Sequence, residues 1–343
     1  MKHQYRESCW AIVSLLTMGV LLFGGANVCA DGHKAKEFKV AMLLPASISD
    51  AGWNALAYDG LKGIEKELGA KISHVESRTP ADQEEHFRAY ALDGYHLIFG
   101  HGYEYQDAAK AVAPDFPETV FITSSGGTIM DNVSPIIFRL EQAAYLLGVV
   151  SGMMTKTDKI GIIGGQNIPS VNSTFMAFEG GVKSVNPDAE VRRAYVGDWE
   201  NIGKAKELAL AQIQEGIDFI FHNADAAGRG VFDAVETSQA QGKFVWTFGS
   251  NRDQSEVSPT TVLANAVITP GAFVQVARLV KEGTFKPKSY VFTMASDGAI
   301  AMNYNPKLKD KVPVAVQKKV EEVKKAILAG NVKVPQIDFE GSD

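Results

Sequence analysis

The chain has 343 residues, more than a single compact core usually holds, which favours about two domains. Its composition is that of a globular protein, 45% hydrophobic and 22% charged, which disfavours a disordered chain, a coiled coil or a polytopic membrane protein. The formal net charge of −6 argues against a nucleic-acid-binding protein, which usually carries a basic face. The two cysteines, Cys9 and Cys29, are too few for a disulfide framework or a multi-thiolate zinc site.

The first thirty residues have the pattern of a secretory signal peptide. A positively charged start precedes an apolar stretch over residues 10–23, which as a helix would span about 21 Å of the ~30 Å hydrocarbon core. Small residues follow, and we expect cleavage after Ala30. Lipid anchoring through Cys29 is the alternative, but Ala26 and Val28 match a lipobox poorly. We therefore expect a soluble periplasmic protein whose mature chain, without cysteine, suits an oxidising compartment.

Beyond this segment, short apolar runs alternate with stretches of helical periodicity. The first run is Phe38–Leu44, and a helical pattern follows from Trp53 to Leu68, stopped by Gly69. Further strands are expected at 71–76, 95–99, 120–123, 159–163, 190–196, 218–221 and 243–248, with helices between them at 81–93, 103–112, 170–185, 202–214 and up to about 241. Because parallel strands need helical crossovers, these two series predict an α/β protein with two doubly wound, Rossmann-like lobes.

Several expected elements lie between the two series or after them. A strand at 135–140 and a helix at 143–154 separate the series, and strands at 262–267 and 290–294 follow the second. This order predicts more than one crossing between the lobes, and therefore a cleft with a multi-segment hinge that closes on a small ligand. The expected divisions are a signal peptide (1–30), an N-terminal lobe (38–138 plus about 269–290), a C-terminal lobe (139–268 plus about 291–310) and a C-terminal helix and tail (311–343).

The sequence contains none of the familiar catalytic or cofactor motifs. A phosphate loop, a zinc-protease helix and a nucleophile elbow are all missing. Gly161, Gly164 and Gly165 have the wrong spacing for a dinucleotide fingerprint and are typical of a tight turn. The seven histidines are scattered without metal-ligand spacing. We therefore expect no enzymatic activity, no cofactor and no metal.

Aromatic and polar side chains gather where the predicted strands end, which is where open α/β sheets bind ligands. The residues placed there are Trp53, Asn54, Tyr103, Trp199, His222, Asn223, Asp225 and Asn251. Rings for stacking, together with amide and carboxylate hydrogen-bonding groups, suit a flat polar heterocycle. For Trp53 the alternative is inward packing at the start of the first helix, and for His222 it is a solvated loop.

Six motifs between Val40 and about Pro306 carry a resemblance to a known family. They are residues 50–61 (DAGWNALAYDGL), 94–100 (GYHLIFG), 145–156 (YLLGVVSGMMTK), 159–165 (KIGIIGG), 181–187 (GVKSVNP) and 253–254 (DQ). In order and spacing the chain resembles the basic-membrane-protein (Bmp) or PnrA-like substrate-binding proteins of ABC transporters. The resemblance implies a type I periplasmic binding fold with two lobes joined by three crossover segments. It also implies delivery of a captured ligand to a membrane permease and ATPase.

The resemblance also implies site residues, and this chain departs from them in part. Characterised members mostly bind purine nucleosides between aromatic rings, and Trp53 and Asn54 match their first-lobe motif. Asn251 stands where such relatives carry an aspartate for the ribose, Ser124 stands where they carry an aspartate for the base, and a ribose-binding lysine is replaced near Ile268. Because a charged hydrogen bond is worth roughly 1.5–3 kcal/mol, these changes favour a free purine base, or a similar planar heterocycle, over a nucleoside.

The expected function is therefore that of the periplasmic solute-binding component of an ABC importer, which captures a purine-like ligand by hinge closure. The expected partners are the planar heterocyclic ligand and an inner-membrane permease, and no nucleic acid. One alternative is a secreted nucleoside-processing enzyme, which the lack of an acidic cluster or metal constellation in the sequence disfavours. The other is a ligand-sensing partner of a membrane receptor, whose sequence would look the same.

Overall fold

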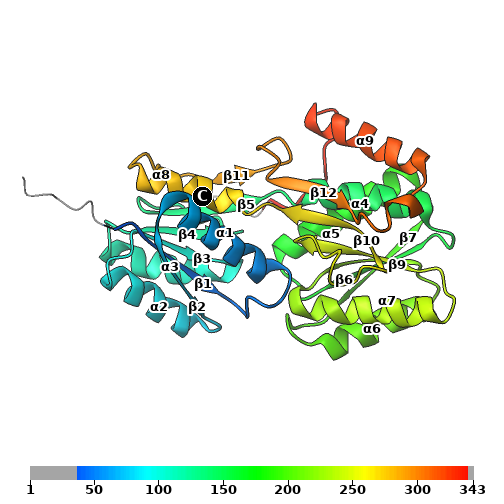
Figure 1. Cartoon of the computed structure of the whole chain (residues 1–343), viewed down its shortest axis with the longest axis horizontal. Helices are drawn as coiled ribbons and strands as arrows, with labels where there is room; N and C mark the ends of the chain where they lie inside the picture. The colour runs from blue at the N-terminus through cyan, green and yellow to red at the C-terminus, as the bar shows by residue number, and fades with distance from the viewer. Residues whose placement is uncertain (1–36, 339–343) are drawn as a thin grey trace, which may run out of the picture. The chain divides into compact units, whose positions relative to one another are not determined.

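Two six-stranded sheets organise residues 37–338, the part of the chain that this computed structural model describes (Figure 1). The expected signal peptide, with Cys9 and Cys29, lies outside these residues. The first sheet has the strand order β11-β5-β4-β3-β1-β2, and all its pairings are parallel. Its strands are β1 (Lys39–Leu44), β2 (Lys71–Glu76), β3 (Leu97–Gly100), β4 (Val120–Ser124), β5 (Val133–Phe138) and β11 (Tyr290–Phe292).

The second sheet repeats this topology, in the order β12-β10-β9-β8-β6-β7. Its strands are β6 (Lys159–Gly164), β7 (Glu190–Tyr195), β8 (Phe219–Asn223), β9 (Trp246–Asn251), β10 (Val262–Ile268) and β12 (Ile300–Tyr304). Only β12, which pairs with β10, runs antiparallel. In each sheet the chain first adds a strand on one side of its starting strand and then continues on the other side. A crevice for ligands forms at such a reversal of strand order.

Helices cover both faces of each sheet, so the inner strands are buried and read as nearly continuous apolar runs. Around the first sheet, α1 (Trp53–Leu68) packs with α8 (Gly271–Lys281), and α2 (Pro80–Leu92) packs with α3 (Gln106–Val112). Around the second sheet, α4 (Glu141–Met154) packs with α5 (Pro169–Val185), and α6 (Ile202–Gln214) packs with α7 (Gly228–Ala240). The last helix, α9 (Val314–Leu328), packs on α4.

Local sequence signals explain several of these boundaries. Helix α1 ends at Gly69, which adopts a left-handed conformation (φ 62°) and donates its N–H to the Glu65 carbonyl. Helix α2 begins with a capping box between Thr79 and Asp82, and Pro80 occupies its first turn. Both boundaries agree closely with the sequence prediction.

The close packing of α4 on α5 depends on two glycines. A Cβ atom added at Gly148 would lie 2.0 Å from the Phe178 carbonyl oxygen. One added at Gly181 would lie 2.0 Å from the Tyr145 carbonyl oxygen. Neither position therefore has room for a side chain, because the two backbones are in direct contact.

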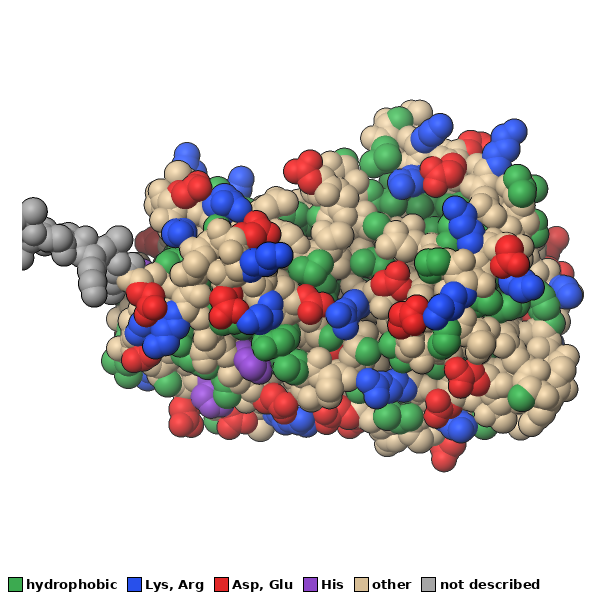
Figure 2. All heavy atoms as spheres, in the orientation of Figure 1, with side chains coloured by type: hydrophobic (Ala, Val, Ile, Leu, Met, Phe, Trp, Pro, Cys, Tyr) green, Lys and Arg blue, Asp and Glu red, His purple; other side chains and the backbone are tan. Residues whose placement is uncertain are grey.

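The chain passes between the two sheets three times: from β5 through α4 to β6, from β10 through α8 to β11, and from β11 to β12. The sequence analysis predicted the strand at 290, but it missed α8 and β12. No helix within residues 37–338 is long and apolar enough to cross a membrane. On the face drawn in Figure 2, basic and acidic side chains are intermixed.

Candidate functional site: a cavity between the two sheets

A cavity lies where the carboxyl ends of the two sheets' strands come together. Its volume is about 660 Å³, part of which is open to solvent. The lining residues are Pro45, Trp53, Gly102, Tyr103, Glu104, Ser125, Phe138, Leu140, Glu141, Ile168, Ser170, Val171, Thr174, Trp199, Asn223, Asp225, Asn251 and Ile268. This is the edge at which open α/β sheets bind ligands, and small-molecule sites typically measure about 300–1,000 Å³. Six of the residues placed at strand ends from the sequence line it: Trp53, Tyr103, Trp199, Asn223, Asp225 and Asn251.

Trp53 forms an aromatic wall on the side of the first sheet, and the buried His101 holds it there. The two rings stack, with centroids 3.9 Å apart and planes 21° from parallel. The imidazole Nε2 lies 3.0 Å from the Trp53 carbonyl oxygen, and Nδ1 lies 2.9 Å from the Ser124 hydroxyl. Because a carbonyl only accepts, Nε2 carries the proton and the Ser124 hydroxyl donates to Nδ1. Burial lowers the pKa of His101 to about 3, so the ring is neutral at physiological pH.

Trp199 supplies the aromatic surface on the side of the second sheet. It follows β7, and its indole lies directly on Gly165, where an added Cβ would be 2.2 Å from the ring atom Cε3. Its carbonyl accepts a hydrogen bond of 2.9 Å from the Ala227 N–H, which fixes the backbone of this segment. Tyr103, in the short helix η1 (Tyr103–Tyr105), adds a further ring from the first sheet. The cavity therefore offers stacking surfaces from both sheets.

Two amides continue the wall at the ends of β8 and β9. Asn251 has a left-handed backbone (φ 66°), and its Nδ2 donates to the Asn223 Oδ1 over 3.2 Å. Asn223 Nδ2 in turn donates to the Thr174 hydroxyl over 3.3 Å. No described residue donates to the Asn251 Oδ1, so this oxygen can accept a hydrogen bond from a ligand in the cavity.

Carboxyl groups from both sheets reach the same cavity. Asp225, in η3 (Asp225–Ala227), is buried, and Glu104 lies in η1 beside Tyr103. Burial raises the pKa of Asp225 well above its usual range, the nearby charges of Asp50 and Glu104 raise it further, and a hydrogen bond from the Trp53 N–H opposes them. The protein atoms packed around Glu104 likewise raise the pKa of its carboxyl, although that side chain stays open to solvent. Two carboxyls that are distant in the chain thus line the same cavity.

Asn54 does not line the cavity. It is fully buried at the start of α1, where its Nδ2 and its backbone N–H both donate to the Asp50 Oδ2 over 2.8 Å. The other Asp50 oxygen accepts from the N–H groups of Gly52 and Ala55, each over 2.9 Å. Asn54 therefore belongs to the cap that fixes the first turn of α1, and with it the position of Trp53.

His222 and Ser124 do not line the cavity either. The His222 ring is fully buried against α7, 4.9 Å from the Phe232 ring between centroids, and an added Cβ at Gly228 would lie 2.3 Å from its Cε1. Burial lowers the pKa of His222 to about 4, so it is neutral at physiological pH. Ser124 is buried behind His101, as described above.

The sequence analysis missed several residues of the cavity wall. Glu104 adjoins Tyr103, which was singled out, and the same strand-end signal applied to it. Thr174 in α5 and Phe138 at the end of β5 carry no comparable signal in the sequence. Within residues 37–338, no group of three or more His, Cys, Asp or Glu side chains is arranged to hold a metal ion.

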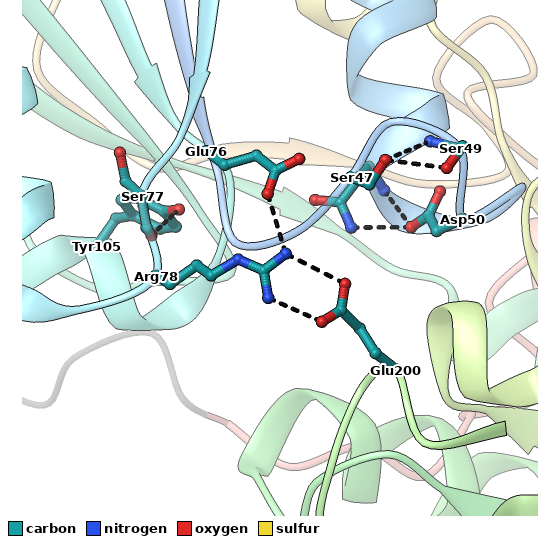
Figure 3. A network of polar contacts seen from close by, with 9 residues as sticks. Ser47, Ser49, Asp50, Glu76, Ser77, Arg78, Tyr105 and Glu200 are labelled. Atoms are coloured by element: carbon teal, nitrogen blue, oxygen red, sulfur yellow. Dashed lines mark hydrogen bonds and ion pairs between the residues drawn. The ribbon is translucent and has the colours of Figure 1, made fainter. Parts of the chain in front are cut away.

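Polar contacts join segments of the first sheet to segments of the second around the cavity. In Figure 3, Arg78 lies between Glu76 and Glu200 and points at both. Its guanidinium contacts both Glu200 oxygens, at 2.7 and 3.2 Å, and the Glu76 carboxylate at 2.9 Å. Further contacts of this kind join Arg252 to Asp59 (2.9 Å), Arg229 to the Ser49 carbonyl (2.8 Å) and Gln254 to the Ala51 carbonyl (3.2 Å).

Two doubly wound sheets, parallel except for β12, are joined by three passages of the chain and have a cavity between their carboxyl ends. This arrangement defines a type I periplasmic solute-binding fold. A solute-binding protein of an Aeropyrum pernix ABC transporter system has this fold, with a TM-score of 0.80 at 22% identity over 88% of this chain and 94% of that one. The chain belongs to the PnrA-like family of ABC transporter substrate-binding proteins, whose signature matches residues 37–338. The expected family and fold are confirmed.

Two characterised relatives are similar over almost their whole length. The ABC transporter nucleoside-binding protein BmpA of Lactococcus lactis is 28% identical over 94% of this chain and 97% of its own. A purine-binding protein of Brucella abortus is 28% identical over 93% of this chain and 87% of its own. Members of the family are solute-binding proteins, not enzymes, and they work with an ABC transporter.

Proposed function

We propose that this protein captures a purine-like solute, a free base in preference to a nucleoside, in the cavity between its two sheets. The observation that carries the proposal is the meeting of aromatic rings from both sheets, Trp53 and Tyr103 with Trp199, beside the amide of Asn251. A planar heterocycle would stack on the rings and donate to the free Asn251 oxygen. The nucleoside- and purine-binding relatives support this class of ligand.

The preference for a base over a nucleoside rests on the uncharged wall of the cavity at Asn251 and Ile268. A ribose would gain no charged hydrogen bond from either of these residues, since one is an amide and the other an aliphatic side chain. We propose further that the protein acts after export, with residues 1–30 removed, and that it closes about the three crossings and delivers the ligand to a permease. Ligand contacts to both sheets would favour the closed state, because only that state offers both sets of contacts.

Isothermal titration calorimetry on the chain from residue 31 tests this proposal. Adenine, hypoxanthine and guanine are compared with adenosine, inosine and guanosine, with glucose as a non-aromatic control. We expect at least one base to bind at least about tenfold, or ~1.4 kcal/mol, more tightly than its nucleoside. Equal or tighter binding of every nucleoside would overturn the preference, and binding of glucose alone would overturn the ligand class. Release of free base from a bound nucleoside would show an enzyme instead.

A further inference from the structure

The charged side chains that line the cavity are all acidic. Three of its side chains are carboxylic acids, Glu104, Glu141 and Asp225, and none of the described residues lining it is Lys, Arg or His. Glu141 is engaged by the Ser173 hydroxyl, which donates to its Oε1 over 2.6 Å. The other two carboxyls come from different sheets, Glu104 after β3 and Asp225 after β8.

Asp225 is held in place by the fold in an unusual conformation. Its backbone is left-handed (φ 48°), which is uncommon outside glycine and is tolerated best by Asp and Asn. It is only 6% exposed, and no described Lys or Arg forms an ion pair with it. Its Oδ1 lies beside the start of α1, since an added Cβ at Gly52 would be 3.8 Å from it. A buried carboxyl without a cationic partner is costly, and a hydrogen-bond donor on a ligand in the cavity would lower that cost.

Glu104 approaches the same space from the first sheet. Its carboxyl turns back over Gly102, where an added Cβ would lie 2.4 Å from Oε2. No described Lys or Arg forms an ion pair with Glu104 either. The charges of Glu104 and Asp225 act on each other, since Glu104 contributes to the raised pKa of Asp225. Two interacting carboxyls in one site are relieved by hydrogen-bond donors placed between them or against them.

We infer that Glu104 and Asp225 are the specificity-determining pair of this cavity and select a planar nitrogen heterocycle that carries an exocyclic amino group. This assignment rests on the proposed function, and it deepens it by naming the class of purine. An ionised carboxyl only accepts hydrogen bonds, and a protonated carboxyl still has one oxygen that only accepts. Each of the two groups can therefore accept an N–H from the ligand. A ligand with an amino group and a ring N–H supplies both, as adenine does.

Calorimetry on E104Q, D225N and the wild type tests the pair, with E85Q as the matched control. Gln and Asn preserve the shape of each side chain, and Asn tolerates the left-handed backbone at 225. Glu85 is an exposed glutamate in α2 that does not line the cavity. The probes are adenine, unsubstituted purine, which lacks the amino group, and benzamidine, a planar amidinium cation. Thermal melts confirm that each variant is folded.

We expect E104Q and D225N each to weaken adenine binding at least about tenfold, with E85Q unchanged, because each replaces a carboxyl oxygen that accepts from the ligand with an amide NH2 that can only donate. Adenine binding within about twofold of wild type in either folded variant would overturn the pair while leaving the proposed function intact. The wild type alone provides a test that does not depend on variant folding: adenine should bind at least about tenfold more tightly than purine, and equal affinities would overturn the inference.

Benzamidine separates a failure of the pair from a failure of the proposed function. If no purine binds, and benzamidine binds the wild type but neither variant, the proposed purine function is overturned. The carboxyl pair is then supported as a cation-selecting site. If neither adenine nor benzamidine binds the wild type, both are overturned.

Discussion

Replacing Gly165 by alanine should weaken ligand binding by moving a ring that the new methyl group touches. The added Cβ would lie 2.2 Å from Cε3 and 2.5 Å from Cζ3 of Trp199, whereas carbon atoms in contact need about 3.5–4.0 Å. The indole must therefore shift by more than about 1 Å, into the cavity or away from it. Stacking a base on an aromatic side chain is worth about 1–3 kcal/mol, so a partial loss predicts about 5- to 30-fold weaker binding.

The assay is a calorimetric titration of adenine into wild type and G165A. The Trp199→Ala variant, in which stacking on this ring is lost completely, gives the largest effect expected. Gly271→Ala is the matched control, because Gly271 has an ordinary φ and nothing within 4 Å of an added Cβ. Urea unfolding should show little change in stability for G165A, since Trp199 is half-buried and can move. Wild-type affinity in G165A would refute the placement of Trp199 against the ligand.

Three further predictions concern stability and closure. His101 has a folded pKa of about 3 against 6.5 for a free imidazole, so stability is intact above pH 6.5 and falls as the pH drops toward 3, by about 2 kcal/mol at pH 5. H101Q should therefore lose less stability than wild type between about pH 7 and 5 in urea unfolding. An equal loss in both proteins would contradict the assignment of the pH dependence to His101. Gly181→Ala should destabilise by at least about 1–3 kcal/mol, because its methyl meets a carbonyl oxygen at 2.0 Å; an unchanged thermal midpoint would count against the α4–α5 contact. Glu200→Gln should weaken adenine binding by less than about fivefold and reduce the salt dependence of binding, because the half-exposed ion pair between Glu200 and Arg78 is screened by salt. An identical salt dependence in variant and wild type would argue against a role of this ion pair in closure.

Much of the fold was predictable because its elements carry strong local signals. The buried strand of β1 is a continuous apolar run, and Gly69 and Pro80 mark helix boundaries that the structure reproduces within one residue. The failures have a local cause as well. Strand β12 has the burial pattern of a partly exposed edge and pairs antiparallel with a strand about forty residues earlier, which no periodicity of its own residues indicates.

The site was predictable to the level of strand ends and no further. His222 and Asn223 are neighbours at the end of β8, and successive side chains on a strand point to opposite faces. His222 therefore packs under α7, while Asn223 turns toward α5 and the cavity. The sequence analysis placed both side chains at this strand end and gave the hydrogen-bonding role to His222, because it had no register to tell the two faces apart. Asn54 was misplaced for a similar reason, since the Asp50 cap that engages it depends on the geometry of a helix start.

The central claim is that the cavity between the sheets holds a purine base in the cell. Mass spectrometry of small molecules released by denaturing the purified mature protein tests it most directly. We predict the mass of a purine base that carries an exocyclic amino group, present at close to one molecule per chain in wild type and depleted in Trp199→Ala. A sugar or another non-aromatic solute in its place would contradict the claim, and an intact nucleoside would contradict the preference for a free base.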